Sequence, residues 1–336
     1  MKLLSFQSFN NIWIHGVQHY LPNNIYNNQR LVDWMQLKIR PSWIEKRTGI
    51  CSRHFVNEGE TCSTLGMATA QKTLDELKIF DPGQLILATV SADYLTPPTA
   101  PLIQHGLKLE GCGAFDLGAA CTGFVSTLHL GGCLTSGNGK PSLLISSELR
   151  SRFLNPKDFA SSVLFGDGSA SAMIVSSPEN NSFKLHASAL LSDGSIGDLI
   201  SIPGGGSRLP GHLVSDKDDF FIKMKSGAEI FARAVGGMHQ LAKKFLYLLN
   251  EECEDIWLVP HQANGHLIKA LGDKLSIPES KVVKTIQHTG NTSGASVGIA
   301  LSHLRASSDL RDGDKILLLA AGGGGLLACA LLSFVA

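Results

Sequence analysis

Asp116-Leu-Gly-Ala-Ala-Cys121-Thr-Gly-Phe-Val-Ser-Thr-Leu128 is a strand-to-helix junction with a cysteine at its centre. An extended apolar stretch ends in small residues, and a helical pattern begins at Cys121. Backbone N–H groups are unpaired at a helix start and the helix dipole is positive there, which favours a thiolate by roughly 0.3–1 kcal/mol and lowers the pKa of the cysteine. We therefore predict that Cys121 is a nucleophile, against the alternative of a small buried cysteine that packs a helix on a sheet.

Two downstream segments place polar side chains at similar junctions. Val259-Pro-His261-Gln-Ala-Asn264 and Gln287-His-Thr-Gly-Asn291-Thr-Ser-Gly-Ala-Ser296 each follow a short apolar run and precede a helical pattern. Open α/β sheets present their chemistry at such strand ends. A single histidine there is more often structural, but a cysteine, a histidine and an asparagine in three matched junctions indicate one catalytic site.

Length and composition set the class of protein. The chain has 336 residues, 43% of them hydrophobic, 35 glycines and a formal net charge of zero. It is long enough for a large core in one domain or two fused domains. Zero net charge gives no basic face for nucleic acid or an anionic membrane, so we expect neither as a partner.

The N-terminal segment and the cysteines indicate a compartment. Residues 1–11 lack the apolar core of a signal peptide, and no stretch reaches the roughly 18 apolar residues of a membrane span. Seven cysteines without a Cys-x-x-Cys pair argue against a disulfide framework and a zinc site. We therefore expect a soluble, cytoplasmic protein with reduced thiols and no bound metal.

Apolar runs of strand length alternate with helical patterns, which predicts an α/β fold with buried strands. Expected strands lie at 85–90, 142–147, 170–175, 256–259 and 315–320, and expected helices at 64–77, 122–134, 228–249 and 265–275. The pattern also repeats: Trp257 follows Ile86 by 171 residues, and Asn291 follows Cys121 by 170. A duplicated unit would place the cysteine of one half opposite the histidine and asparagine of the other. The polar segment Ser177–Ser182 divides the predicted halves, 1–177 and 178–336.

These residues closely resemble those of the beta-ketoacyl-acyl carrier protein synthase III family, in the thiolase-like superfamily. The matching motifs run nearly end to end: Trp43-Ile-Glu-Lys-Arg47-Thr-Gly-Ile50, the Cys121 junction, Phe165-Gly-Asp-Gly168, His261-Gln-Ala-Asn264, Gly290-Asn291-Thr-Ser293 and Gly322–Gly325. The resemblance implies a five-layered αβαβα fold of two duplicated halves, usually a homodimer. It also implies an acyltransferase of fatty acid or related biosynthesis, without a permanently bound cofactor.

The resemblance assigns roles as well. Cys121 would take an acyl group from an acyl-CoA or acyl-ACP and pass it, with loss of carbon dioxide, to a malonyl thioester such as malonyl-ACP. His261 and Asn291 would donate hydrogen bonds to the enolate oxygen. The backbone N–H groups of Cys121 and Gly323 would donate to the oxyanion that forms when Cys121 attacks the thioester. Trp43 and Arg47 would bind the coenzyme A nucleotide.

The chain also departs from the family pattern. Phe159 and Ala228 replace an arginine and an asparagine of the cofactor channel, and His266 replaces an arginine that contacts acyl carrier protein. Thr96 and Ala321 replace bulky residues of the acyl pocket, which favours an acyl group longer than acetyl.

Three other functions and one other site remain as alternatives. A family member could transfer its acyl group to an oxygen or nitrogen of a small molecule, or the chain could be a non-catalytic paralogue. Papain-like hydrolases also use cysteine, histidine and asparagine in this order, but their local cysteine signature is absent. The Gly322–Gly325 run could suggest a phosphate loop, but no Gly-x-x-Gly-Lys pattern follows, so tight packing is favoured.

Overall fold

The computed structural model describes residues 5–78, 81–253, 255–307 and 309–336, so the first four residues of the N-terminal segment lie outside it. The described helices are α1 (Asn28–Met35), α2 (Pro41–Thr48), α3 (Cys62–Leu77), α4 (Ala100–Gly106), α5 (Gly123–Asn138), α6 (Phe159–Ser162), α7 (Gly227–Leu248), α8 (Gly265–Leu275), α9 (Ile286–Thr289) and α10 (Ser296–Ala306). The strands are β1 (Gln7–Ser8), β2 (Trp13–Tyr20), β3 (Asn24–Asn27), β4 (Ser52–Phe55), β5 (Gln84–Ala88), β6 (Gly113–Leu117), β7 (Ser142–Glu148), β8 (Gly168–Val175), β9 (Ser182–Ser192), β10 (Ile200–Ser201), β11 (Lys223–Met224), β12 (Ile256–Pro260), β13 (Lys315–Gly322) and β14 (Leu326–Val335).

Most of the strands form one ten-stranded mixed sheet, whose order is β12-β13-β14-β9-β2-β8-β7-β5-β6, with β1 beside β9. Pairs β5–β6, β5–β7 and β12–β13 are parallel. Every residue of β5, β7 and β8 is buried, as the apolar runs predict. Strands β2 and β9 pair at only two positions, where one half of the sheet gives way to the other.

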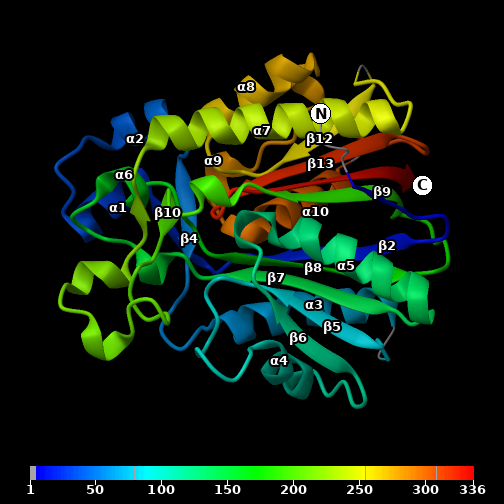
Figure 1. Ribbon diagram of the computed structural model, residues 1–336, viewed down its shortest axis with the longest axis horizontal. Helices are drawn as coiled ribbons and strands as arrows, with labels where there is room; N and C mark the ends of the chain where they lie inside the picture. The colour runs from blue at the N-terminus through cyan, green and yellow to red at the C-terminus, as the bar shows by residue number, and fades with distance from the viewer. Residues whose placement is uncertain (1–4, 79–80, 254, 308) are drawn as a thin grey trace.

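The two halves of the sheet enclose α5 and α10. Both helices contact strands of both halves, and their apolar residues form a core with Ile14, Phe183 and Ile316. Helices α7 and α8 cover the outer face of the β12–β14 half, and α3 and α4 cover the β5–β7 half (Figure 1). The predicted five-layered αβαβα fold is therefore confirmed.

The internal repeat is visible in the elements themselves. Strand β12 begins 172 residues after β5, and α10 begins 173 residues after α5. Each of the two helices follows a 3₁₀ turn, η1 (Ala120–Thr122) or η7 (Ser293–Ala295). The structural counterpart of Cys121 is therefore Gly294, and the predicted pairing with Asn291 is wrong by one helical turn. The boundary between halves stays a prediction; β8 ends at Val175 and β9 begins at Ser182.

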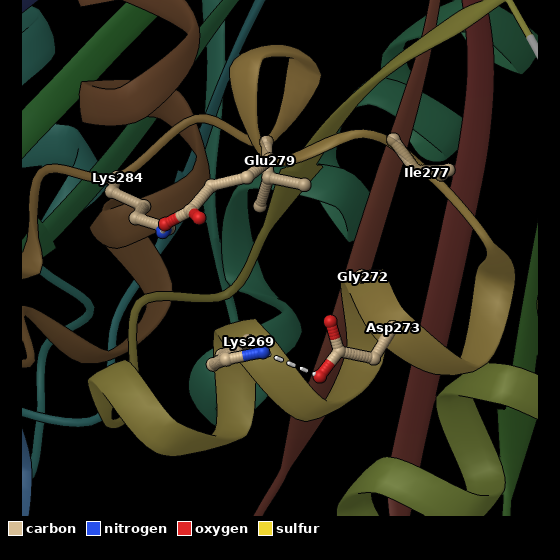
Figure 2. A pocket seen from close by; sticks show the side chains of 7 residues that line it. Lys269, Gly272, Asp273, Ile277, Glu279 and Lys284 are labelled. Carbon is tan, nitrogen blue, oxygen red and sulfur yellow. Dashed lines mark hydrogen bonds and ion pairs between the residues drawn. The ribbon is translucent and has the colours of Figure 1, made fainter.

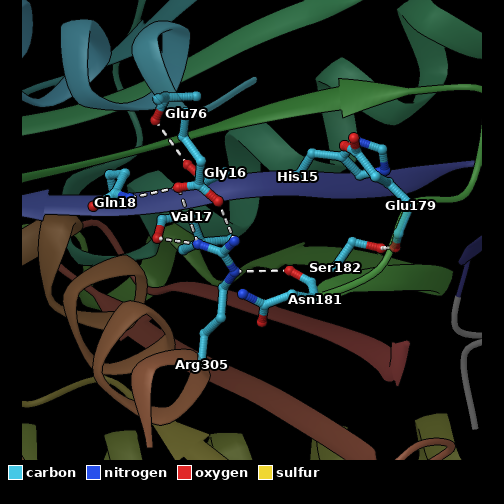
Figure 3. Close-up of polar contacts among 10 residues, drawn as sticks. His15, Gly16, Val17, Gln18, Glu76, Glu179, Asn181, Ser182 and Arg305 are labelled. Atoms are coloured by element: carbon cyan, nitrogen blue, oxygen red, sulfur yellow. Dashed lines mark hydrogen bonds and ion pairs between the residues drawn. The ribbon is translucent and has the colours of Figure 1, made fainter. Parts of the chain in front are cut away.

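Polar contacts tie the two halves together at the end of α10 (Figure 3). Arg305 of α10 contacts the carboxylate of Glu76 on α3 and donates to the carbonyl of Asn181 at 2.8 Å. His15 of β2 lies 3.1 Å from Glu179 in the connection between β8 and β9. These contacts hold the end of α10 against α3 and against the connection between β8 and β9. Among the described residues, no helix is long and apolar enough to cross a membrane.

Candidate active site

Cys121 lies in a strained turn between β6 and α5. The helix begins at Gly123 rather than at Cys121, because the preceding residues form the 3₁₀ turn η1. Ala120 has a φ of +42°, in the left-handed region that alanine rarely adopts. Such strain persists only where the surroundings enforce it and is common at functional sites. The turn leaves the Cys121 sulfur part-buried, 3.7 Å from the hydroxyl of Ser293.

Asn291 and Ser293 come from the corresponding turn of the other half. The backbone N–H of Asn291 donates to the carbonyl of Leu164 at 2.8 Å, and its side-chain Oδ1 accepts from the N–H of Ser293 at 2.8 Å. Ser293 has a φ of +50°, which repeats the strain of the cysteine turn. Because Oδ1 is occupied, the amide NH₂ of Asn291 is the group left to donate to a substrate.

Gly294 lets the two turns approach each other. A Cβ at this position would lie 2.8 Å from the carbonyl oxygen of Ala120 and 3.1 Å from a carboxylate oxygen of Glu148. Only a residue without a side chain fits this contact. The cysteine turn of one half therefore meets the turn of Ser293 and Gly294 in the other half. The predicted place of Cys121 opposite His261 and Asn291 stays a prediction.

His261 follows the last residue of β12 and points to the start of α10. Its backbone N–H donates to the carbonyl of Leu319 at 2.7 Å, and its Nδ1 lies 2.7 Å from the hydroxyl of Ser296. The side chain is 3% exposed, and burial lowers the pKa of His261 to about 4. The imidazole is therefore neutral at neutral pH. Ser296 is one turn after Ser293, so α10 links His261 to the cysteine turn.

Gly322 at the end of β13 and the following Gly323 pack against the cysteine turn, and Gly325 packs against the end of β9. The backbone N–H of Gly323 contacts the Cys121 sulfur. A Cβ at Gly322 would lie 2.9 Å from the Cys121 nitrogen, and one at Gly325 would lie 2.0 Å from the carbonyl oxygen of Asp193. Tight packing, rather than a phosphate loop, accounts for this glycine run.

The expected thiolate is not the resting form of Cys121. Burial raises the pKa of the Cys121 thiol above its ordinary value, and the Ser293 hydroxyl, the Arg150 guanidinium and the Gly323 N–H only partly oppose it. Our expectation of a lowered pKa was wrong because it counted the helix start and not the desolvation.

Glu148, the last residue of β7, belongs to the same cluster and was missed from the sequence. It is 1% exposed, and one of its oxygens accepts from the hydroxyl of Ser293 at 3.3 Å. Burial raises the pKa of Glu148 to about 7. The signal in the sequence was an acidic residue directly after the predicted buried strand 142–147, where an unpaired carboxylate is costly.

The pocket in Figure 2 is separate from this cluster. It lies beside α8, where Lys269 contacts Asp273 at 2.7 Å and Lys284 contacts Glu279. Because each lysine is paired with an acid, the pocket offers little to a phosphate. No contact among the described residues joins its lining to Cys121.

Comparison with known proteins identifies the family. Residues 115–194 match the model of 3-oxoacyl-[acyl-carrier-protein] synthase III, and residues 250–334 match the model of its C-terminal part. A beta-ketoacyl-[acyl-carrier-protein] synthase III of Oleidesulfovibrio alaskensis is 37% identical over 93% of this chain and 96% of its own. The chain belongs to the beta-ketoacyl-[acyl-carrier-protein] synthase III family. It is accordingly an acyltransferase.

Two further relatives show the range of this family. A 3-oxopimeloyl-[acyl-carrier-protein] synthase of Brucella abortus is 34% identical over 92% of this chain and 94% of its own. The crystal structure of the 3-oxoacyl-[acyl-carrier-protein] synthase III of Aquifex aeolicus is 33% identical, covers 96% of this chain and 100% of its own, and superposes with a TM-score of 0.86.

The residues expected at the coenzyme A nucleotide lie together in this synthase III family member. Trp43 and Arg47 are on α2, with the Arg47 guanidinium 6.0 Å from the Trp43 ring centre. Phe159, 45% exposed, meets Trp43 edge-on at 5.6 Å between ring centres. An aromatic surface therefore stands where the resemblance predicts an arginine. It can stack on a base but cannot pair with a phosphate.

His266 is exposed on α8, and its part in carrier-protein contact stays a prediction. Its Nε2 donates to the carbonyl of Lys46 at 2.9 Å, and Asn264 donates to the carbonyl of Arg47 at 3.3 Å. These bonds position α2 against α8. Ala228, near the start of α7, is exposed and offers no side-chain hydrogen bond.

The two predicted acyl-pocket residues lie apart. Ala321 is near the end of β13, two residues from Gly323 and part-buried against the α7 side of the core. Thr96 is exposed on the loop between β5 and α4, and no contact among the described residues links it to Cys121. Within one chain, the structure brings Ala321 near the cysteine turn and does not bring Thr96 there.

Proposed function

We propose that the protein transfers an acyl group from a thioester to Cys121 and condenses it with a malonyl thioester, with loss of carbon dioxide, to give a 3-oxoacyl thioester. The observation that supports the proposal is that the Cys121 sulfur contacts the Ser293 hydroxyl and the Gly323 N–H. Asn291 and His261 bond to Ser293 and Ser296 of the same segment.

In the first half-reaction the Cys121 sulfur attacks the thioester carbonyl and the donor thiolate leaves. Splitting the transfer through an acyl-enzyme replaces one difficult step by two easier ones. The negative charge that develops on the carbonyl oxygen needs fixed donors. The Gly323 N–H, which contacts the Cys121 sulfur, and the N–H of Cys121 itself would supply them.

In the second half-reaction the malonyl thioester loses carbon dioxide, and its enolate attacks the acyl-cysteine. The enolate oxygen needs donors that do not protonate the carbanion. His261 is neutral because of its low pKa, and the Asn291 amide cannot ionise, so both stabilise the enolate without quenching it.

The direct test is to incubate the protein with acetyl, hexanoyl and octanoyl coenzyme A and to measure its intact mass, then to add malonyl-ACP and measure carbon dioxide. We expect a mass increase by one acyl group, followed by carbon dioxide release and a 3-oxoacyl product. Acylation followed by transfer to an alcohol or amine, without carbon dioxide, would instead support the small-molecule acyltransferase. Peptide cleavage would support a papain-like hydrolase, and no reaction a non-catalytic paralogue.

Acyl carrier protein and coenzyme A thioesters are the proposed partners, in fatty acid or a related biosynthesis. Exposed Lys46 and Arg47 on α2 supply positive charge beside the nucleotide site. The replacements at Phe159, Ala228 and His266 remove charge-assisted bonds, so donor binding should depend more on the pantetheine arm and the acyl chain. The reduced cysteines expected from the sequence fit a cytoplasmic location.

We also propose a homodimer formed through β6. This strand is at the edge of the sheet, and unpaired edge strands readily pair with another chain. Apolar side chains gather beside it: Phe115 is 37% exposed, Tyr94 60% and Leu95 90%.

Phe115→Asp should convert the dimer to a monomer, because it places a charge at the centre of this edge. Sedimentation velocity measures the mass. Tyr247→Asp is the matched control, because Tyr247 is 80% exposed on α7, away from β6, and should leave the dimer intact. A monomeric wild-type protein, or a Phe115→Asp protein that stays dimeric, would contradict the proposal.

The enlarged acyl pocket predicts a preference for chains longer than acetyl. Each additional buried methylene is worth about 0.8 kcal/mol, or roughly fourfold in kcat/KM for self-acylation. We expect hexanoyl and octanoyl thioesters to react faster than acetyl, and Ala321→Phe to reverse the order. Thr96→Phe should act only if a second subunit places its loop at the pocket, so its effect should vanish in the Phe115→Asp monomer. A wild-type preference for acetyl would refute the prediction.

A further inference from the structure

Behind the Cys121 sulfur, a short polar chain leads into the core. The sulfur lies 3.7 Å from the Ser293 hydroxyl oxygen, and that oxygen lies 3.3 Å from one carboxylate oxygen of Glu148. The three residues come from η1, η7 and the end of β7, which meet only in the folded chain. We propose that Glu148 accepts the thiol proton of Cys121 through the hydroxyl of Ser293, an inference that rests on the proposed acylation of this cysteine.

Neither His261 nor Asn291, the two proposed catalytic partners of Cys121, is suited to accept the proton of the Cys121 thiol. The thiol resists ionisation because burial raises its pKa. His261, with a pKa of about 4, would hold a proton poorly at neutral pH, and the Asn291 amide does not titrate. Glu148, with a pKa of about 7, is the group suited to take and return a proton near neutral pH.

The surroundings of Glu148 hold it in place without neutralising it. The oxygen that does not face Ser293 accepts from the Ser91 hydroxyl at 3.1 Å and from the Val90 N–H at 3.4 Å. Arg150 lowers the pKa of Glu148 electrostatically. The charge of Glu148 in turn adds to burial in raising the thiol pKa of Cys62 on α3 and of Cys121 on η1. The carboxylate is thus fixed and can change its charge.

The thiol proton leaves Cys121 in the first half-reaction and returns to it in the second. As the Cys121 sulfur bonds to the acyl carbon, its proton passes to Ser293 while the Ser293 proton passes to Glu148. The bond from the acyl carbon to the donor sulfur breaks, and the donor thiolate takes a proton from water. When the enolate carbon displaces Cys121, the thiolate recovers its proton from Glu148 through Ser293. Of the two relay residues, Ser293 touches the reacting sulfur and Glu148 acts through it.

The test is the pH dependence of two reactions of Cys121 in Glu148→Gln and Ser293→Ala. Alkylation by iodoacetamide, located by peptide mass, needs no substrate of the enzyme, and acylation by hexanoyl coenzyme A follows the proposed function. In the wild-type protein both rates should rise with increasing pH, in one step at the pH range in which Glu148 loses its proton. Each variant should lose this step and react about 10²-fold more slowly near neutral pH, since positioned acid–base groups contribute at least that much. The double variant should be no slower than either single one.

Asp167→Asn is the matched control. Asp167 is a fully buried carboxylate nearby that accepts from Ser151 and from the Val56 N–H, and no described contact joins it to Cys121. The step should persist in this variant. A step that survives Glu148→Gln or Ser293→Ala, or a loss of rate that is equal at every pH, would overturn the relay. An alkylation step without any acylation by thioesters would instead overturn the proposed function and leave the relay standing.

Discussion

Cys121→Ala should abolish acyl loading completely. The variant removes the sulfur that would form the thioester bond. Among the described cysteines, Cys121 is the one placed against the Gly323 N–H and the Ser293 hydroxyl. Cys62 and Cys329 are buried in the core, where desolvation raises the thiol pKa of Cys62 to about 12. Intact mass after incubation with hexanoyl coenzyme A measures the loss, and the expected mass increase is zero.

The control for this experiment is Cys253→Ala. Cys253 is part-buried, as Cys121 is, but it packs against the outer core formed by α7 and α8. This variant should acquire one acyl group at the wild-type rate. Covalent acylation that persists in Cys121→Ala would refute the assignment of the nucleophile.

The fold was predictable because its strands are buried on both faces. Runs of apolar and small residues in β5, β7 and β8 mark such strands, and their alternation with helical patterns leaves few arrangements. The duplication was also predictable, but its register was not. The sequence aligned Cys121 with Asn291, whereas the turns η1 and η7 align it with Gly294, because the strained backbone of Ala120 and Ser293 leaves no periodic signal.

The site was only partly predictable. The positions of Cys121, His261 and Asn291 at strand-to-helix junctions could be read from the chain, since each follows an apolar run. The electrostatics could not, because desolvation depends on what packs around a group. That is why the raised pKa of Cys121 and the role proposed for Glu148 appear only in the folded protein. Thr96 lies on an exposed loop, so its part in the site depends on a second subunit.

His261→Ala and Asn291→Ala should slow decarboxylation on the order of 10²–10³-fold while acyl loading changes much less. Each variant removes one donor to the enolate oxygen, and loss of one such donor costs about this much in rate. The cysteine turn keeps its contacts with Ser293 and Gly323, so attack on the acyl thioester continues. Carbon dioxide release from malonyl-ACP measures one half-reaction, and intact mass at short times measures the other.

The pH dependence of decarboxylation separates a hydrogen-bond donor from an acid or base at His261. Because burial lowers the pKa of His261 from 6.5 to about 4, the imidazole stays neutral as the pH falls through the usual histidine range. In protein already acylated on Cys121, the wild-type decarboxylation rate should therefore stay level between about pH 5 and about pH 8, instead of changing near the ordinary histidine pKa. His303→Ala, which changes an exposed histidine on α10 away from Cys121, should leave both half-reactions unchanged. Equal damage to loading and decarboxylation in His261→Ala, together with a rate change near pH 6.5, would mean that the histidine acts as a general base for Cys121.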